Sequence, residues 1–496
     1  MEGIKRNTNS SFSPYPLLVI GLILLAYVLL KQAWLMAAVV VIMPFLAFYV
    51  VVVLNKPYWG FITLFALNYF FIGILRYVDV QNSSVIMDIF IVFLLASIFL
   101  YALCGGKIPW NRANNKLLYI SLAWMIYVFF ELFNPSAVTE AWIFTRGSFY
   151  NFTLLVLLTS LLLNKTRDIK RILFLLSVFT LIAVGKALMQ RYIGFDSGET
   201  DWLIKSTSYR THLLRTGTRY FSIFSDAGNF GSNMGMAAVI YMILSFYVSN
   251  KKLRYYYRFV SLLAAYALMM SGTRGAMIVP LGGLAMFILL NKDIRHIAGG
   301  VICLLFIYIF FAHTSLLDSN RQIRRMRTAF HPEKDASYMV RKENQKRLAE
   351  YMVHKPFGEG VGLAGGEGRR FSRRFTTEIP TDSHYVSIWV QFGIVGLCLH
   401  IAILLFVIAY SAYLIMFRIR NRELKGMLIA MNCGLWGIML SAYGNNFFWQ
   451  YPTGYIVYIF QTFLVLGKSY DNELTGQTKL EPNINKYIII WILNMK

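Results

Sequence analysis

Long apolar runs recur along almost the whole chain, separated by short polar connections. A bilayer core of roughly 30 Å needs about 20 apolar residues for one crossing helix. The alternation typical of barrel strands is missing, and the runs are too long for such strands. The pattern therefore predicts an all-α polytopic membrane protein with twelve to fourteen transmembrane helices. The expected spans are residues 17–30, 33–54, 57–77, 85–103, 116–134, 149–163, 170–193, 229–249, 257–272, 275–291, 296–312, 385–417, 427–447 and 452–467.

The longest hydrophilic interruption of this pattern runs from about residue 313 to 384. It carries fourteen basic residues against nine acidic ones, a helix-like segment at 337–354 and a glycine-rich turn at 356–362. We expect one large external loop that contains short helices. The chain then divides into N-terminal transmembrane helices (1–312, with a short external loop at 194–228), the large loop (313–384), C-terminal transmembrane helices (385–468) and a cytoplasmic tail (469–496).

Composition and charge agree with this class and set the orientation. With 57% hydrophobic and 15% charged residues, an ordinary soluble protein is excluded. The net charge of +24 fits anchoring charges and anionic membrane lipids, and no nucleic-acid-binding motif accompanies it. Basic residues gather in alternate short connections, such as 107–116, 165–171 and 418–425. The positive-inside rule places these connections in the cytoplasm and the large loop on the opposite side.

Two arginines stand where polar breaks meet apolar spans. Arg219 lies where the short external loop enters a span, and Arg274 lies in the break Ser-Gly-Thr-Arg-Gly at 271–275. A charge held near the membrane boundary is costly without a partner. A guanidinium offers a planar fork of donors that suits phosphate oxygens, and the glycines beside Arg274 would let a bulky ligand approach. Both arginines are candidate anion-binding groups. The alternative is a snorkelling arginine, or a pair between Arg274 and Asp226.

His384 is the histidine with the most suggestive surroundings, because Asp382 and Ser383 precede it and an apolar span follows. A histidine can take a proton from an attacking hydroxyl near neutral pH. It can equally mark a polar helix start with Asp382 or Ser383 as the N-cap. The other histidines show no spacing of metal ligands, so no metal site is expected.

Further basic residues lie inside the large loop. Arg341 stands on the helix-like segment, as a third phosphate contact or as a surface charge. Arg369 and Arg370 open a run of arginines that forms a solvated face or contacts lipid headgroups or an anionic acceptor. Asp382 is a further candidate contact for the acceptor or a headgroup. The turn at 356–362 lacks the Gly-Lys-Ser/Thr ending of a phosphate loop, so we interpret it as a tight fold-back toward the membrane.

Four segments follow one another in a recognisable order: residues 219–229, Ser-Gly-Thr-Arg-Gly at 271–275, the loop with Arg341 and Lys-Pro-Phe-Gly-Glu-Gly-Val-Gly at 355–362, and His384 followed by Gln-Phe-Gly-Ile-Val-Gly-Leu at 391–397. Over about residues 210–400, this order resembles the family of O-antigen ligases and O-antigen polymerases. The family often has asparagine where Tyr385 stands and glutamate where Gln391 stands.

The resemblance implies a membrane-embedded glycosyltransferase, similar to the GT-C-like enzymes. Such an enzyme moves a glycan from undecaprenyl diphosphate to an acceptor hydroxyl at the periplasmic face of the bacterial inner membrane, with inversion and without metal, cofactor or ATP. Arg219, Arg274 and Arg341 would hold the diphosphate, and His384 would orient or deprotonate the acceptor. A ligase uses a sugar of the lipid A core as the acceptor, and a polymerase uses another lipid-linked glycan. The basic loop favours the ligase, because it suits a phosphorylated acceptor.

Two other classes remain open. A polysaccharide flippase or other transporter would carry paired charges inside its helices and internal symmetry, with Lys186 and Glu131 as the main buried charges here. A cell-wall glycan polymerase of the shape and elongation type would use an acidic base in its long loop, such as Asp382 or Glu378.

Overall fold

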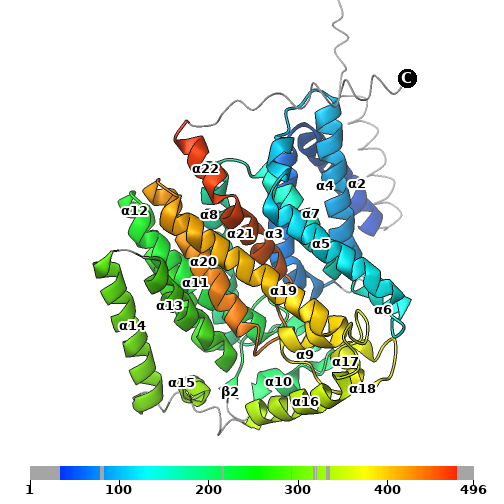
Figure 1. Cartoon of the computed structure of the whole chain (residues 1–496), viewed down its shortest axis with the longest axis vertical. Coiled ribbons are helices and arrows are strands. Elements are labelled where there is room, and N and C mark those ends of the chain that lie inside the picture. The colour runs from blue at the N-terminus through cyan, green and yellow to red at the C-terminus, as the bar shows by residue number, and fades with distance from the viewer. Residues whose placement is uncertain are drawn as a thin grey trace, which may run out of the picture. The chain divides into compact units, whose positions relative to one another are not determined.

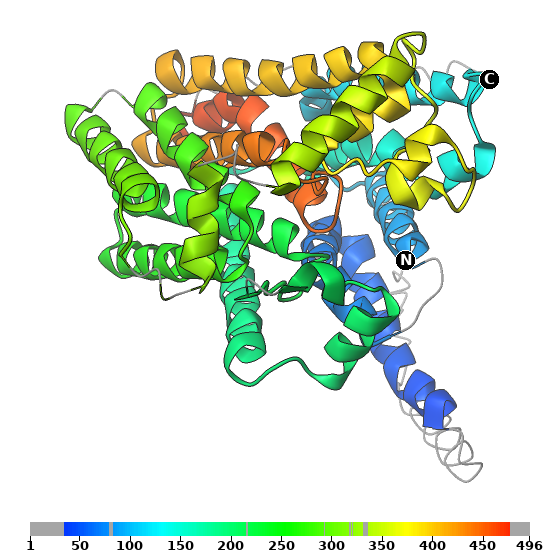
Figure 2. The same cartoon turned by 90° about the horizontal axis from the view of Figure 1, so that it is seen from below.

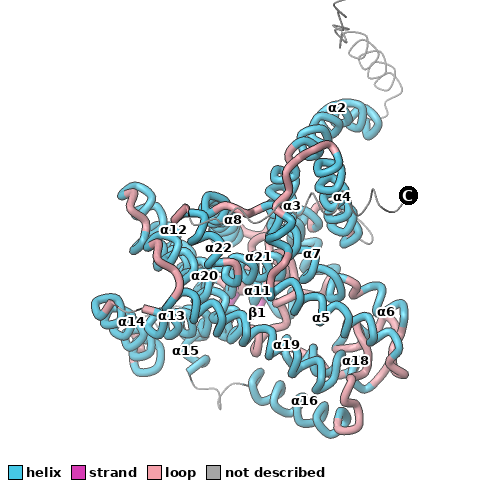
Figure 3. The backbone as a smooth tube through the Cα atoms, turned by 45° about the horizontal axis from the view of Figure 1, so that its top comes forward, coloured by secondary structure: helices cyan, strands magenta, loops and turns pink. Residues whose placement is uncertain are grey.

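The computed structural model describes residues 34–78, 83–214, 217–291, 293–316, 319, 321–330 and 336–476. Within them, strand occurs only in the antiparallel pair β1 (Leu213–Leu214) and β2 (Gly217–Thr218), and helix dominates (Figure 3). The predicted all-α membrane class is confirmed. Among the described helices, seven are long and apolar enough to cross a membrane: α3 (Pro57–Leu75), α4 (Ser84–Leu103), α5 (Lys116–Phe130) with its extension η2 (Glu131–Phe133), α8 (Thr166–Tyr192), α11 (Ala227–Tyr247), α19 (His384–Phe417) and α20 (Arg422–Ser441).

Each predicted span within the described residues overlaps a helix. The expected span at 17–30 and most of the expected tail lie outside the described residues, and the number of crossings stays a prediction. The remaining helices at predicted spans are α2 (Trp34–Asn55), α7 (Gly147–Leu162), α12 (Lys251–Met270), α13 (Ile278–Leu290), α14 (Ile294–His313) and α21 (Thr453–Val465).

One expected span was too long. Residues 427–447 were predicted as one helix, but α20 ends at Ser441 and an irregular segment follows up to α21. Gly444, Asn445 and Asn446 explain the difference, because glycine and asparagine are turn residues and stop the helix. This segment, residues 442–452, supplies part of the candidate site below.

The described residues form two compact units, one from positions up to 62 with 92–107, and one from 63–91 with 108 onward. In the second unit, α11 and α20 are enclosed by other helices along most of their length. α11 packs on α12, α13 and α20. Gly231 and Gly235 allow this closeness, because a methyl group at either position would press on the side chains of Ser271 and Val279. The polar break at 271–275 therefore lies directly against the start of α11.

Short helices gather at one end of the second unit, here called the loop end (Figure 1). Figure 2 shows this end, where α16 lies beside the start of α19. The predicted helix at 337–354 is confirmed as α16, and α22 (Gly467–Leu474) lies at the opposite end (Figure 1). The short helices at the loop end are α9 (Ser197–Lys205), α10 (Tyr209–His212), α15 (Arg321–Arg327), α16 (Ala336–Met352), α17 (Gly365–Gly368) and α18 (Phe375–Glu378).

The glycine-rich turn packs against a break in α19. Gly393 has φ 66° and ψ −171°, which interrupts the helix. The N–H of Glu359 donates to the carbonyl oxygen of Val390 at 2.8 Å, and the N–H of Gly362 donates to Oε1 of Gln391 at 2.8 Å. The Gln391 amide also donates from Nε2 to Oγ of Ser387 at 2.9 Å. A glutamate lacks this donor, which gives the amide at position 391 a structural reason.

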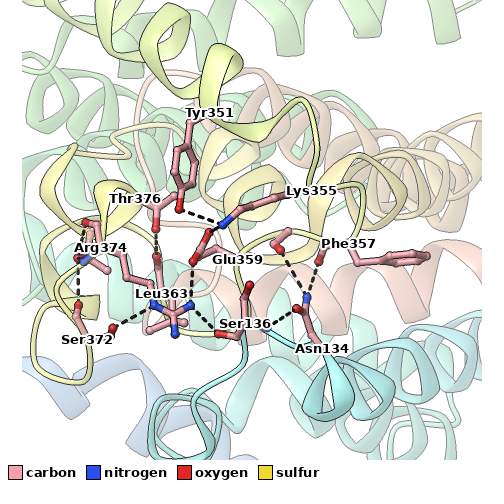
Figure 4. A network of polar contacts seen from close by, with 12 residues as sticks. Asn134, Ser136, Tyr351, Lys355, Phe357, Glu359, Leu363, Ser372, Arg374 and Thr376 are labelled. Carbon is pink, nitrogen blue, oxygen red and sulfur yellow. Dashed lines mark hydrogen bonds and ion pairs between the residues drawn. The ribbon is translucent and has the colours of Figure 1, made fainter.

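Polar contacts tie the same loop to the segment after α5 (Figure 4). The Glu359 carboxylate is buried and pairs with Nζ of Lys355 and, at 2.8 Å, with Nη1 of Arg374. Nη1 of Arg374 also donates to the carbonyl oxygen of Ser136 at 2.6 Å, and Nδ2 of Asn134 donates to that of Phe357 at 3.2 Å. Burying a carboxylate is favourable only when its oxygens are paired, and here both are.

Replacing Gly393 with alanine is expected to lower the free energy of unfolding by at least about 2 kcal/mol. The backbone conformation at this position is essentially restricted to glycine. A Cβ atom there would also overlap the carbonyl oxygen of Pro356. Thermal unfolding in detergent would measure the effect. Gly185→Ala, in the helix α8 with open space around the added methyl, is the matched control and should not lower the midpoint. Equal midpoints for the two variants would contradict the prediction.

Candidate functional site

A cavity of about 300 Å³, here called the arginine cavity, opens at the loop end. Its walls come from the segment before α11, η3 (Arg274–Met277) with the start of α13, α15 with η4 (Thr328–Phe330), the start of α16, and the end of α20 with the segment after it. Four arginines line it: Arg219, Arg274, Arg325 and Arg341. The three arginines that the sequence suggested as diphosphate ligands therefore meet at one cavity, although more than 120 positions separate the first from the last.

The β1–β2 hairpin places Arg219 at the cavity. Its backbone N–H donates to the carbonyl oxygen of His212 at 2.8 Å, and its Nη2 donates to Oγ1 of Thr273 at 2.8 Å. Its Nε is buried and has no hydrogen-bond partner among the described residues. A Cβ atom on Gly272 would lie 3.2 Å from Cγ of Arg219. Gly272 thus makes room for this protein side chain, a use that the sequence did not indicate.

Arg274 lies in the polar break that follows α12. Its Nη1 donates to Oγ1 of Thr328 at 3.2 Å. The expected alternative partner, Asp226, serves as the N-cap of α11 and accepts from the N–H groups of Gly228 and Asn229 at 2.6 and 2.9 Å. Arg274 therefore lines the cavity, and the Asp226 carboxylate accepts hydrogen bonds from the N–H groups at the start of α11.

Arg325 is a cavity residue that the sequence did not single out. Its Nε donates to the carbonyl oxygen of Gly272 at 2.8 Å, which directs the side chain toward the break after α12. The only signal in the sequence was its membership of the basic run at 321–327, which has no apolar flank to make the charges costly.

The electrostatics of the cavity favour an anion. Burial lowers the pKa of Arg219 below its ordinary value, Asp226 opposes this shift, and the positive charges of Arg274 and Arg341 add to it. A guanidinium remains protonated at neutral pH even so. An anion bound between these groups would relieve both the burial and the mutual repulsion.

Three other candidate residues lie elsewhere in the large loop. Asp382, half exposed, accepts from Nε of Arg341 at 3.4 Å. Arg369 pairs with Glu378 at 2.8 Å, and the Arg370 guanidinium lies 5.8 Å from the ring centre of Phe144. Arg369 and Arg370 are not among the residues that line the arginine cavity.

His384 opens α19 and is completely buried, so the structure does not bring it into the arginine cavity. Ser383 occupies the N-cap position, without a side-chain cap bond. Nδ1 of His384 lies 3.3 Å from Oδ1 of Asn446, and its Nε2 lies 3.2 Å from Nε2 of His400. Because an amide oxygen only accepts, Nδ1 carries the proton, and Nε2 of His384 accepts from His400.

The segment after α20 connects the histidine pair to the cavity. The N–H of His384 donates to the carbonyl oxygen of Ala442 at 3.0 Å, Asn445 lines the cavity, and Asn446 contacts the ring of His384. His384 thus lies directly behind one wall of the arginine cavity. The Gly-Asn-Asn triplet at 444–446 was the signal for this turn, whereas His400 had no distinguishing neighbours in the sequence.

An apolar cavity of about 320 Å³ adjoins the arginine cavity between α19 and α20. The two cavities share Leu440 and Tyr443 as lining residues, so a charged space and an apolar one lie next to each other. The other lining residues of the apolar cavity are Tyr385, Ile401, Leu404, Leu405, Trp436 and Met439.

The buried charges of the transporter alternative have local partners. Lys186 pairs with Asp196 at 2.7 Å and with Glu199 at 3.1 Å, and the Glu131 carboxylate accepts from Nδ2 of Asn134 at 3.0 Å. The first pairs join α8 to the start of α9, and the second contact lies at the end of the span formed by α5 and η2. Among the described residues, no three His, Cys, Asp or Glu side chains come together as a metal site requires.

Comparison with known proteins agrees with the resemblance seen in the sequence. A search of curated proteins found no match. Residues 259–401 match the family model described as O-antigen ligase. The matched region contains three of the four cavity arginines together with His384. Over residues 259–401, the chain is therefore similar to the O-antigen ligase family.

Proposed function

We propose that the protein transfers a glycan from undecaprenyl diphosphate to an acceptor hydroxyl at the periplasmic face of the inner membrane. The observation that carries this proposal is the convergence of four guanidinium groups on one cavity of about 300 Å³. Guanidinium forks match phosphate oxygens in geometry and charge, and a diphosphate offers several such oxygens at once. The multi-pass membrane fold and the O-antigen ligase match support a lipid-linked glycan as the substrate.

The apolar cavity beside the arginines supports an amphiphilic donor. A polyprenyl diphosphate needs a charged site for its head and an apolar surface for the first units of its tail. The two cavities provide both, and they adjoin at Leu440 and Tyr443. Burial of the tail against Trp436 and Met439 would hold the diphosphate beside Arg219 and Arg274.

The arginines would act on the leaving group. The bond between the anomeric carbon and the diphosphate oxygen breaks, and the acceptor oxygen forms the new bond from the opposite face, with inversion. Negative charge grows on the diphosphate as it leaves, and preplaced guanidinium groups stabilise that charge. The acceptor proton needs a base.

We assign the base to His384, with His400 as its partner. The acceptor hydroxyl would have to replace Asn446 at Nδ1, since the ring is buried behind that side chain. For this step the pair would carry the other neutral tautomers, with the proton of His384 on Nε2 and that of His400 on Nδ1, so that Nε2 of His384 donates to Nε2 of His400. The free Nδ1 of His384 then takes the hydroxyl proton, and the ring becomes an imidazolium.

The ligase reaction, with lipid A core as the acceptor, is favoured over polymerisation by the charge of the large loop. Arg369 and Arg370 lie in this loop outside the arginine cavity, where they would contact phosphate groups of the acceptor lipid. A polymerase, whose acceptor is another lipid-linked glycan, is the second candidate, because the O-antigen family has the same architecture in both.

Transfer in vitro tests the proposal. Purified protein is mixed with an undecaprenyl-diphosphate glycan and lipid A core, in EDTA and without ATP. Glycan joined to lipid A core is the expected result. Longer glycans that stay on undecaprenyl diphosphate would identify a polymerase instead. Movement of the lipid across vesicles without any new glycosidic bond would overturn the transferase and favour a flippase.

A further inference from the structure

A third cavity, of about 330 Å³ and here called the basic cavity, lies at the other end of α11 from Arg219. α11 has 21 residues, so the two ends are about 30 Å apart. The walls come from the first turns of α8, α12 and α20 and from the last turn of α11. These are ends at which the sequence places its basic connections.

Contacts with α22 show that two of these connections lie together. The carboxylate of Asp471 accepts from the backbone N–H of Arg420 at 3.1 Å, and the N–H of Thr166 donates to Glu473 at 2.8 Å. The basic segments at 165–171 and 418–425 therefore meet at one end of the bundle, as the sequence analysis expected. The basic cavity opens at this meeting point.

The mouth of the basic cavity carries an excess of positive charge. Arg167, Lys170 and Arg171 line it, against the single carboxylate of Glu423. Lys170 pairs with Glu423 at 2.9 Å, with the two side chains 47% and 35% exposed. Ion pairs this exposed contribute little, so both groups remain open to a further ligand. Arg171 also lies 3.8 Å from the buried carboxylate of Asp168. Three cations against two carboxylates leave a net positive charge at the mouth, which attracts a phosphate group.

The interior of the basic cavity is apolar. Leu173, Leu244, Leu253 and Met427 form its floor, and the ring of Phe174 beside them is 46% exposed. A soluble anion would leave this apolar surface uncovered. A lipid without net charge would not use the three cations. A ligand that satisfies both parts has a phosphate head and a hydrocarbon chain.

We infer that the basic cavity binds an anionic glycerophospholipid, with its phosphate at Arg167, Lys170 and Arg171 and an acyl chain against Leu173 and Phe174. The inference is independent of the proposed glycan transfer, because none of these residues lines the arginine cavity. Basic cavities between transmembrane helices are a general means of holding anionic headgroups.

Binding by the detergent-solubilised full chain tests this inference. The unfolding midpoint is measured against increasing dioctanoyl phosphatidylglycerol, dioctanoyl phosphatidylcholine and inorganic phosphate. The concentration of phosphatidylglycerol that produces a given rise in the midpoint is expected to be at least tenfold lower than that of phosphatidylcholine or inorganic phosphate. Each basic side chain is worth about fivefold in affinity, so Arg167→Gln with Lys170→Gln should weaken the effect at least about tenfold.

The matched control is Lys251→Gln with Lys252→Gln. These exposed residues start α12 at the same end of the bundle, carry the same charge and do not line the basic cavity. The control should respond to phosphatidylglycerol as the wild type does. An equal loss in both double variants would show a diffuse surface attraction and overturn the inference. Equal stabilisation by phosphatidylcholine, or by inorganic phosphate, would overturn it as well. Both double variants should unfold at the wild-type midpoint without lipid.

Discussion

Replacing Arg274 with alanine is expected to lower the rate of glycan transfer by about 10²–10³-fold. Arg274 projects from the break after α12 into the arginine cavity, where Arg219 and Arg341 supply the neighbouring charges. If these groups stabilise the departing diphosphate, the loss appears mainly in kcat, because the charge of the leaving group grows in the transition state. A smaller rise in KM for the lipid-linked donor should accompany it.

Two variants make this result specific. Arg274→Lys keeps the charge but loses the planar fork, so a partial recovery is expected. Lys342→Ala removes an exposed charge from α16 next to Arg341, outside the cavity, and should transfer glycan at the wild-type rate. All variants need unfolding midpoints close to that of the wild type. Unchanged kcat and donor KM in Arg274→Ala would remove Arg274 from the donor site.

In the sequence, the cost of burying charge singled out two of the arginines that line the arginine cavity. Arg219 and Arg274 stood out because each interrupts or borders an apolar span, where an unpartnered guanidinium is expensive. Arg325 offered no such contrast, since it lies within a run of basic residues. Its place at the cavity depends on how the chain after α14 folds back onto the carbonyl of Gly272, which no local pattern encodes.

The helices were predictable for a similar reason, and their ends were less so. Apolar length identifies a span, so the helices at the predicted spans were found within the described residues. The end of α20 was misplaced, because Phe447 and Phe448 continue the apolar run although Gly444 has already stopped the helix. Those two rings are buried in the folded chain. Hydrophobicity reports burial, and it does not distinguish a helix from a buried turn.

Replacing His384 with alanine is expected to lower kcat for transfer by about 10²–10⁴-fold, with little change in the donor KM. The donor site should be preserved, because His384 lies behind the wall of the arginine cavity and contacts none of its arginines in the bonds described above. A glycan donor that still binds but no longer reacts is the signature of a lost base.

His400 decides whether this histidine acts alone. Its Nε2 lies 3.2 Å from Nε2 of His384, and both rings are buried. If the two share the proton taken from the acceptor, His400→Ala lowers kcat as well, and the double variant loses no more than His384→Ala does, since groups that act as a unit are non-additive. The cycle is measured from kcat at saturating donor, with unfolding midpoints as the control for folding. If the fold-loss of kcat in the double variant equals the product of the losses in the two single variants, His400 has a separate, structural role. A His384→Ala variant with wild-type kcat would place the base elsewhere, with Asp382 beside Arg341 the first acidic group to examine.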